Sequence, residues 1–412
     1  MNVLHLSTSD IDNGGARAAY RLHQGLRSLG CTSKMLVRAK FSSDPTVMAE
    51  RSALTKLSPP ISEIPLRLYP HNSGMFSTQW FPDILAAKTA QLNPDVINLH
   101  WVNNGYLRIE TLAKFNKPLI WTLHDMWPFT GGCHYSKDCD KYKTSCGACP
   151  QLQSNRTSDL SRWVWQRKAK TWKEANLTIV ASSNWMADCT RSSSLFKGRR
   201  IEIIPCCLDT EKYKPIDRQI ARELLNLPQD RQLILFGAIG GSADGRKGFH
   251  LLQPALQQLN AAGWSNQIEL VVFGASEPEK PIDLGFKTHY QGYVRDDIAL
   301  ALIYSAADVM VVPSLQEAFG QTASEALSCG TPVVAFNATG LKDIIDHQQN
   351  GYLAAAFEVD DLAKGIAWVL EDRERQQKLR FNARQKSLRE FACDVQARRY
   401  LSLYEDVLKC SA

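Results

Sequence analysis

The chain has 412 residues, 44% of them hydrophobic and 22% charged, and it shows no low-complexity tract and no solenoid repeat, which excludes a disordered chain and a repeat protein. A single hydrophobic core rarely grows beyond about 250–300 residues, so this length predicts two domains. The net charge of +6, from 48 basic and 42 acidic residues, is small for a dedicated nucleic-acid binder, and we expect no nucleic-acid partner.

Short apolar, β-branched runs alternate with helical stretches along the chain, which is typical of βαβ units and a parallel sheet. The first series of predicted strands covers residues 3–7, 34–37, 95–99, 119–123, 177–181 and 201–204. The second series covers residues 232–236, 268–273, 309–312 and 332–336. We therefore predict an α/β protein with two Rossmann-like, doubly wound domains.

The segment from Ile204 to Pro215 contains two prolines and has no hydrophobic period, so it predicts the link between the domains. The first domain then covers residues 1–207 and the second covers residues 208–391. The last stretch, 392–412, has helical spacing and no strand after it. It could finish either domain, and we predict a helix that packs back on the N-terminal one.

A glycine-containing loop follows a predicted strand in each domain. Gly14 and Gly15 precede a helical run, whereas Gly240 begins a longer loop that ends with Arg246 and Lys247. Glycine lets backbone amides approach an anionic group, and two adjacent cations suit a diphosphate. The alternatives are a plain tight turn in the first loop and solvated cations in the second. Neither loop carries a full dinucleotide fingerprint or a Walker motif.

Two carboxylates, Glu317 and Glu325, stand eight residues apart after the predicted strand 309–312. Glu317 precedes a predicted helix and Glu325 lies two turns into it, so both can face one ligand at the carboxyl edge of the sheet. Carboxylates accept paired hydrogen bonds from vicinal hydroxyls, which a sugar and a ribose both carry. Two solvated charges are the alternative.

Four cysteines crowd into one loop with the spacing C-x5-C-x6-C-x2-C: Cys133, Cys139, Cys146 and Cys149. In a cytosolic chain this spacing favours a tetrahedral structural zinc site, and disulfide pairing or unpaired thiols are the alternatives. A zinc ion there would fix the loop that follows Asp125.

The stretch from Arg162 to Lys173 has five basic residues, three tryptophans and no acidic residue. Cations and indole rings both gain at an anionic lipid surface, so this stretch predicts a peripheral membrane contact. A helix with inward tryptophans and solvated cations is the alternative. No apolar run approaches the ~18 residues of a spanning helix and the N-terminus lacks a signal-peptide pattern, so we expect a cytoplasmic protein.

The segment from Pro313 to Val334 resembles the E-x7-E signature and the following G-T-P-V-V strand of retaining glycosyltransferase family 4. That family has the GT-B fold, in which two Rossmann-like domains face each other across a cleft. The first glycine loop, the T-L-H-D motif at 122–125, the linker and the lysine–glycine pair of the second loop follow in the family's order. Residues 98–151 resemble most the enzymes of colanic-acid and exopolysaccharide synthesis.

By this resemblance the protein is a hexosyltransferase that uses a UDP- or GDP-sugar and needs no catalytic divalent metal. Glu317 would bind hydroxyls of the transferred sugar and Glu325 would bind the ribose. Arg246 and Lys247 would bind the diphosphate, although the family usually places an arginine where this chain has Ile239. His124 would lie near the transferred sugar, and it competes with the leaving phosphate for the role of general base. Backbone groups of three further residues would also contact the donor: Phe319, Gly320 and Gln321.

The acceptor that the resemblance implies is a glycan or a polyprenyl-linked oligosaccharide in cell-surface polysaccharide synthesis. Two other interpretations stay open, namely a non-catalytic nucleotide-sugar-binding partner subunit and a GT-B nucleotide-sugar epimerase. An inactive binder is expected to lose part of the set Lys247, Glu317 and Glu325. All three are present, which favours an active enzyme.

Overall fold

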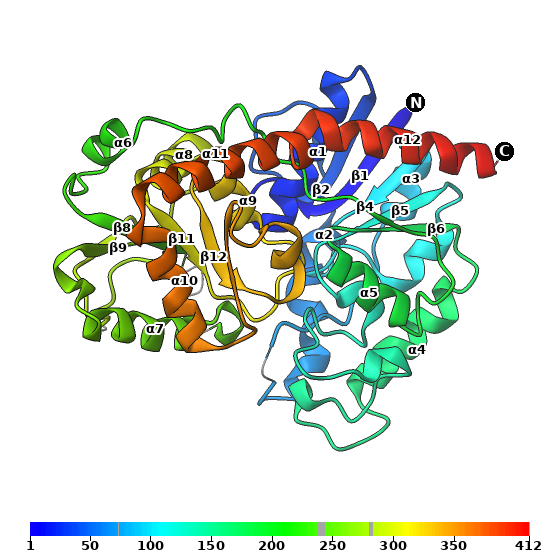
Figure 1. Cartoon of the computed structure of the whole chain (residues 1–412). Coiled ribbons are helices and arrows are strands. Elements are labelled where there is room, and N and C mark those ends of the chain that lie inside the picture. Colours follow the sequence, from blue (N-terminus) through cyan, green and yellow to red (C-terminus); the bar gives the residue numbers. More distant parts are fainter. Residues whose placement is uncertain (73, 238–243, 280–282, 412) are drawn as a thin grey trace. The chain divides into compact units, whose positions relative to one another are not determined.

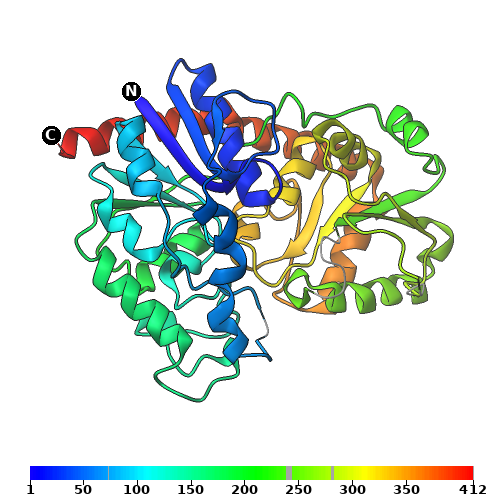
Figure 2. The same cartoon turned by 180° about the vertical axis from the view of Figure 1, so that it is seen from behind.

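The computed structural model describes residues 1–72, 74–237, 244–279 and 283–411 (Figure 1). They divide into two compact units, one formed by Met1–Cys207 with Asp394–Ala412 and the other by Leu208–Cys393. Each unit is a parallel sheet with helices on both faces, as Figure 1 and the view from behind in Figure 2 show. Among the described residues, no helix combines the length and the apolar character needed to cross a bilayer.

The first unit contains a seven-stranded sheet in the order β3-β2-β1-β4-β5-β6-β7. Its strands are β1 (Asn2–Ser9), β2 (Thr32–Ala39), β3 (Val47–Ala49), β4 (Val96–Leu99), β5 (Leu119–Leu123), β6 (Leu177–Ala181) and β7 (Ile201–Ile203). Its helices are α1 (Gly14–Ser28), α2 (Ala53–Ser62), α3 (Leu85–Leu92), α4 (Leu160–Trp172), α5 (Asn184–Ser192) and α12 (Cys393–Ser411). The strand order reverses between β1 and β4, which is where doubly wound sheets bind their ligands.

The second unit contains a six-stranded sheet in the order β10-β9-β8-β11-β12-β13. Its strands are β8 (Gln232–Gly237), β9 (Ile268–Phe273), β10 (Thr288–Tyr290), β11 (Val309–Val312), β12 (Val333–Phe336) and β13 (Gly351–Ala354). Its helices are α6 (Arg218–Leu224), α7 (Phe249–Ala261), α8 (Asp297–Ala306), α9 (Gln321–Ser328), α10 (Val359–Glu371) and α11 (Arg373–Glu390). Here the order reverses between β8 and β11, so the loops after these two strands lie at the switch point.

All ten predicted strands are present, and most of them are apolar runs buried along most of their length. The exception is β7, an edge strand whose three residues are only partly buried. Three short edge strands were missed: β3, β10 and β13. The first helix also begins earlier than predicted. Asn13 accepts a hydrogen bond from the backbone N–H of Ala16 at 3.0 Å, so α1 starts at Gly14 and the paired glycines form its first turn.

Helix α12, drawn in red in Figure 1, belongs to the first unit although it ends the chain. The Tyr404 hydroxyl lies 2.7 Å from the amide nitrogen of Asn98, and the Tyr400 hydroxyl lies 3.0 Å from the Thr122 hydroxyl. All four side chains are buried. The last helix therefore satisfies polar groups of the central strands β4 and β5.

Candidate active site

Two loops of the second unit meet at the switch point beside β8 and β11. A short 3-10 helix, η7 (Gly245–Lys247), ends the loop after β8, and Glu317 lies in the loop after β11. The Lys247 ammonium donates a hydrogen bond to the Glu317 carboxylate at 2.7 Å, and the Arg246 guanidinium lies 3.5 Å from the same oxygen. The structure thus brings together three of the residues predicted to bind the donor.

The backbone ties these two loops to each other. The Leu315 N–H donates to the Arg246 carbonyl, and the Arg246 guanidinium donates to the Gln316 carbonyl, both at 2.8 Å. Asp244 accepts from the Arg246 N–H at 3.1 Å and so caps η7. Arg246 is therefore a structural tie between the loops as well as a cation of the site.

Gly248, which follows η7 and precedes α7, is required by this geometry. Its φ of +71° lies in the left-handed region, and a Cβ built on it would stand 1.8 Å from the Pro313 carbonyl oxygen. Only glycine lets the two backbones approach this closely. Sequence reasoning used the neighbouring lysine and did not single out this contact.

The Glu317 side chain is only 13% exposed, and burial alone would raise the pKa of its carboxyl. The cations Lys247 and Arg246 outweigh that effect and hold the pKa below its ordinary value. The Glu317 N–H also donates to the Thr339 hydroxyl at 3.1 Å. The carboxylate is thus ionised and its backbone fixed, as a group that accepts hydrogen bonds from a polyol must be.

The remaining predicted donor contacts continue from Glu317 into α9. Gly320, with a φ of +114°, turns the chain into the helix that begins at Gln321, and no side chain among the described residues caps this helix start. Phe319 is buried against Phe391, with ring centroids 5.5 Å apart. The backbone amides at this turn therefore lie at a helix N-terminus, which favours an anion.

Glu325 lies inside α9 and is buried. The Tyr304 hydroxyl donates to its carboxylate at 2.9 Å, a contact that sequence reasoning missed because the two residues belong to different helices. Gly240 and Ile239 lie outside the described residues, so the glycine part of the loop after β8 has no structural description.

In the first unit, three histidines that lie in or directly after neighbouring strands contact one another in a row. His5 in β1, His100 after β4 and His124 after β5 form a hydrogen-bonded row. Gly15 packs against the last of them, because a Cβ built on it would lie 3.3 Å from the His124 ring. The glycine turn and His124, which were predicted separately, are thus neighbours at the switch point.

Asp125, next to His124, is held by contacts with other side chains of the first unit. Its carboxylate contacts His134 at 2.6 Å and accepts hydrogen bonds from the Trp101 indole at 2.8 Å and the Trp127 N–H at 2.9 Å. Burial raises its pKa, but the His134 contact and these hydrogen bonds lower it below the ordinary value. Asp125 therefore anchors the cysteine-rich loop that follows.

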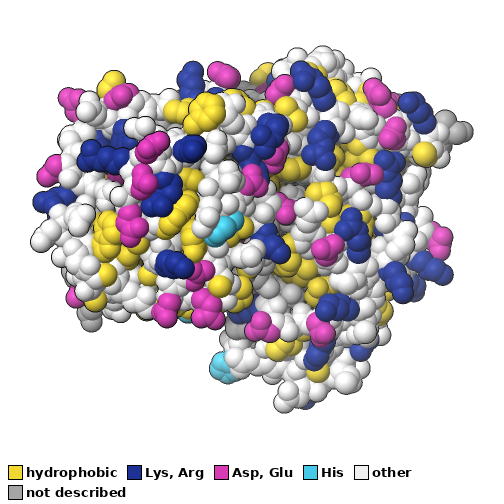
Figure 3. All heavy atoms as spheres, viewed as in Figure 1, with side chains coloured by type: hydrophobic (Ala, Val, Ile, Leu, Met, Phe, Trp, Pro, Cys, Tyr) yellow, Lys and Arg dark blue, Asp and Glu magenta, His cyan; other side chains and the backbone are white. Residues whose placement is uncertain are grey.

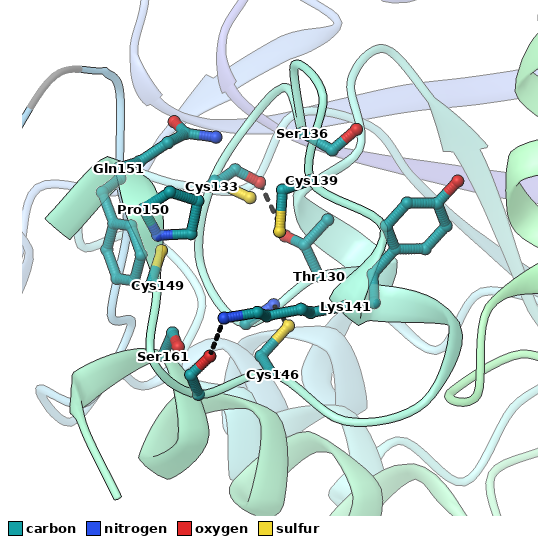
Figure 4. A pocket seen from close by; sticks show the side chains of 14 residues that line it. Thr130, Cys133, Ser136, Cys139, Lys141, Cys146, Cys149, Pro150, Gln151 and Ser161 are labelled. Carbon is teal, nitrogen blue, oxygen red and sulfur yellow. Dashed lines mark hydrogen bonds between the residues drawn. The ribbon is translucent and has the colours of Figure 1, made fainter. Parts of the chain in front are cut away.

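The four clustered cysteines line one cavity of the first unit, as Figure 4 shows. All are free thiols, and burial is the first reason why the pKa values of Cys133, Cys146 and Cys149 are raised. Within the part of the chain that the structure describes, no group of three His, Cys, Asp or Glu residues is placed to hold a metal ion. The structure therefore gives the zinc prediction no support.

Several basic and aromatic side chains of helix α4 make contacts inside the first unit. Lys168 is buried and donates to the carbonyls of Trp127 and Thr130, and the buried Trp172 donates to the Ile109 carbonyl at 2.8 Å. Arg167 forms an ion pair with Glu110 at 2.6 Å. Of the three tryptophans only Trp172 is buried, whereas Trp163 is 40% exposed. The inward-facing alternative therefore holds for Trp172, and some cations of α4 pair within the protein instead of being solvated.

Exposed apolar side chains recur along the sequence of α2, the 3-10 helix η1 (Ile64–Leu68) and the residues that follow. We call this set the α2–η1 patch: Leu54, Leu57, Ile64, Leu68 and Met75, which are 37%, 54%, 45%, 81% and 63% exposed. Arg51, Lys56 and Arg67 are exposed among them, together with one acidic residue, Glu63. On the face drawn in Figure 3, by contrast, basic and acidic side chains are interspersed.

Comparison with known proteins gives the class of the protein. The first unit matches the family model "Glycosyltransferase Family 4" over residues 12–212, and the second matches "Glycosyl transferases group 1" over residues 217–386. The chain is 22% identical to sucrose-phosphate synthase of Thermosynechococcus elongatus, with a TM-score of 0.71 and full coverage of both chains. It is 18% identical to HepE of Anabaena, solved in complex with UDP and glucose, with a TM-score of 0.65 over 98% of this chain and 99% of that one.

The curated relatives give the family. D-inositol 3-phosphate glycosyltransferases are 26% identical in Xylanimonas cellulosilytica, over 99% of this chain and 96% of the relative, and 30% identical in Saccharomonospora viridis, over 74% and 67%. The putative colanic acid biosynthesis glycosyl transferase WcaC of Escherichia coli is 24% identical over 84% of this chain and 85% of the relative. The chain therefore belongs to glycosyltransferase family 4. Its two units are the halves of a GT-B fold, and it is a glycosyltransferase, as predicted.

Proposed function

We propose that the protein transfers a hexose from a nucleotide diphosphate sugar, with retention of the anomeric configuration, to an acceptor used in cell-surface polysaccharide synthesis. The observation that carries this proposal is the contact of Lys247 and Arg246 with Glu317 at the switch point of the second unit. Two cations suit a diphosphate, and an ionised carboxylate beside them suits sugar hydroxyls. HepE, which shares the fold, was solved with UDP-glucose, and this supports a nucleotide sugar as the donor.

In this proposal the bond between the anomeric carbon and the diphosphate breaks while the bond to the acceptor oxygen forms on the same face of the sugar. The departing diphosphate takes the acceptor's proton. Lys247, Arg246 and the amides at the start of α9 stabilise the charge that develops on the leaving group. Since these groups supply the positive charge, we expect EDTA to leave turnover unchanged.

The names of the relatives support two acceptor classes. WcaC is named as a putative enzyme of colanic acid biosynthesis, which supports a glycan acceptor, free or lipid-linked. Two relatives are named for D-inositol 3-phosphate, which makes a small phosphorylated polyol the second candidate. An assay of UDP release from UDP-glucose with D-inositol 3-phosphate, or with membrane lipid extracts, separates the two.

A thermal-shift experiment tests the donor assignment. A ligand that binds only the folded state stabilises it by about 2.7 kcal/mol when present at 100 times its Kd. We expect UDP or GDP to raise Tm, and the matching nucleotide sugar to raise it further. Glu317→Ala should keep most of the shift from the free nucleotide and lose the extra shift from the sugar, because Lys247 remains available to the phosphates. If no nucleotide shifts the wild-type protein, the proposed function is wrong.

The α2–η1 patch supports a contact with an anionic membrane on the cytoplasmic side, where lipid-linked acceptors are built. Leu57 and Leu68 are exposed beside Arg51, Lys56 and Arg67, a combination that suits the surface of an anionic bilayer. Burying one leucine contributes roughly 1.5–3 kcal/mol. We therefore expect the double variant Leu57→Asp/Leu68→Asp to lower binding to phosphatidylglycerol vesicles at least about tenfold in a sedimentation assay.

Ile220 and Leu224 on α6 provide a matched control, since they are 53% and 63% exposed and belong to the other unit. Ile220→Asp/Leu224→Asp should bind the vesicles like the wild type. Equal losses in both double variants, or wild-type binding by the first, would count against the patch as the lipid contact.

A further inference from the structure

The histidine row of the first unit is held by two contacts between ring nitrogens. His5 Nδ1 lies 2.9 Å from His100 Nε2, and His100 Nδ1 lies 3.1 Å from His124 Nε2. The rings meet edge to edge, with centroids 5.2 Å and 5.4 Å apart and planes inclined by 28° and 22°. His5 and His100 are 0% and 2% exposed, whereas His124 at the end of the row is partly exposed.

Proton counting restricts the tautomers of this row. Burial is the first reason why the pKa of His124 is lowered to about 4 and why the pKa values of His5 and His100 are held well below their ordinary value. Each ring is therefore neutral near pH 7 and carries one N–H. Each contact between two rings requires one N–H and one bare nitrogen, so fixing the tautomer of one ring fixes the other two.

Two arrangements satisfy both contacts. In the first, each ring carries its proton on Nδ1, so that His5 donates to His100 and His100 donates to His124. In the second, each ring carries its proton on Nε2, and the donations run the other way. The arrangements differ at the buried end of the row, because His5 Nε2 is buried without a hydrogen-bond partner.

An orphaned buried N–H is rarer in proteins than an under-satisfied acceptor. The second arrangement leaves the His5 Nε2–H without a hydrogen-bond acceptor, whereas the first leaves only a nitrogen lone pair without a donor. The row therefore favours the first arrangement. In that arrangement His124 uses Nε2 to accept from His100, and its Nδ1–H is the group left for a ligand.

We propose that His100, supported by His5, is a positioning residue that holds His124 as the neutral Nδ1–H tautomer, so that His124 offers a hydrogen-bond donor, and not a general base, to a ligand at this edge of the first unit's sheet. The proposal rests on the proposed function for the identity of that ligand. It also decides between the two roles that sequence reasoning left open for His124.

The row cannot serve as a proton relay either. A proton taken by His124 Nδ1 in the second arrangement would have to move along the row to His5, which already carries its proton on Nε2. His5 would become a cation at a fully buried position, where desolvation is very costly. The acceptor's proton must therefore leave by another route, in agreement with its transfer to the departing diphosphate.

The test is the tautomer itself, measured by long-range 1H–15N NMR on protein labelled at histidine, with His124→Asn used to assign the His124 signals. We expect the wild-type protein to show His124 in the Nδ1–H form. A His124 signal in the Nε2–H form overturns the proposal, whether or not His100→Phe folds. This measurement needs no substrate, so its outcome is independent of the nucleotide thermal shift that tests the proposed function.

His100→Phe keeps an aromatic ring and removes both hydrogen bonds. We expect it to populate both tautomers of His124 and to lower kcat/KM for the nucleotide sugar that gives the largest thermal shift by about tenfold, the effect of one lost hydrogen bond. His23→Phe is the matched control, because His23 touches the edge of His5 with centroids 5.9 Å apart but lies outside the row. It should leave the His124 tautomer unchanged. If His100→Phe folds and changes neither the tautomer nor kcat/KM, His100 has no positioning role.

Discussion

Lys247→Ala is expected to lower kcat/KM for the nucleotide sugar by about 10²–10³-fold, which is the usual cost of removing one charge-stabilising donor from an active site. The Lys247 ammonium lies 2.7 Å from the Glu317 carboxylate, and its side chain is only 33% exposed. A bound diphosphate would replace Glu317 as its partner. Turnover is measured as UDP or GDP release, and binding as the thermal shift with the free nucleotide, which this variant should lose.

Lys287→Ala is the matched control for that variant. Lys287 belongs to the same unit and also faces a carboxylate, Glu269 at 3.5 Å, but its side chain is 69% exposed. Exposed ion pairs contribute little, so we expect turnover within about twofold of the wild type. Turnover of Lys247→Ala within about threefold of the wild type would remove Lys247 from the proposed site.

Gly248→Ala is expected to destabilise the protein by about 3 kcal/mol or more and to abolish nucleotide binding. A Cβ at this position would stand 1.8 Å from the Pro313 carbonyl oxygen, so one of the two loops must move. The loops that would separate carry Lys247 and Glu317. The change is measured as the free energy of unfolding in urea together with the thermal shift on adding nucleotide.

Two glycines serve as controls for the separate parts of this effect. Gly263 has a φ of +91°, and a Cβ built on it would meet nothing within 4 Å, so Gly263→Ala should cost only the left-handed backbone strain, about 1–2 kcal/mol. Gly245 lies in the same turn as Lys247, and a Cβ there also has open space around it. Gly245→Ala should keep nucleotide binding. Equal stability of the Gly248→Ala and Gly263→Ala variants would falsify the steric explanation.

The sequence predicted the central strands because their burial on both faces leaves an apolar run that no other element of that length shows. The edge strand Thr288–Tyr290 is different, since all three of its residues are only partly buried and only one neighbouring strand holds them. The edge strand Ile201–Ile203 is equally short and equally exposed but carries two isoleucines, whereas Thr288–Tyr290 has no aliphatic residue and so gives no hydrophobic signal. Val47–Ala49 is equally short and also pairs on one side only.

In the site, sequence reasoning found the residues whose chemistry is visible in a single motif. Lys247 and Glu317 stand 70 positions apart, and their contact was expected only through the family resemblance and the parallel sheet. Tyr304 and Thr339 were missed, because each is hydrogen-bonded to a site residue that is distant in the sequence. Such a contact produces no motif and no hydrophobic period. One available signal was not used. His100 and His124 each follow a leucine at the end of a buried strand, and these two strands are neighbours in the sheet.

Helix α12 has a consequence for the order in which the chain folds during synthesis. Domains usually fold in the order in which they leave the ribosome. Here the second unit is one continuous segment, whereas the first needs Asp394–Ala412 to be complete. Until those residues emerge, Asn98 and Thr122 lack the tyrosine hydroxyls that they meet in the finished core. The segment made first is therefore among the last to reach its final state.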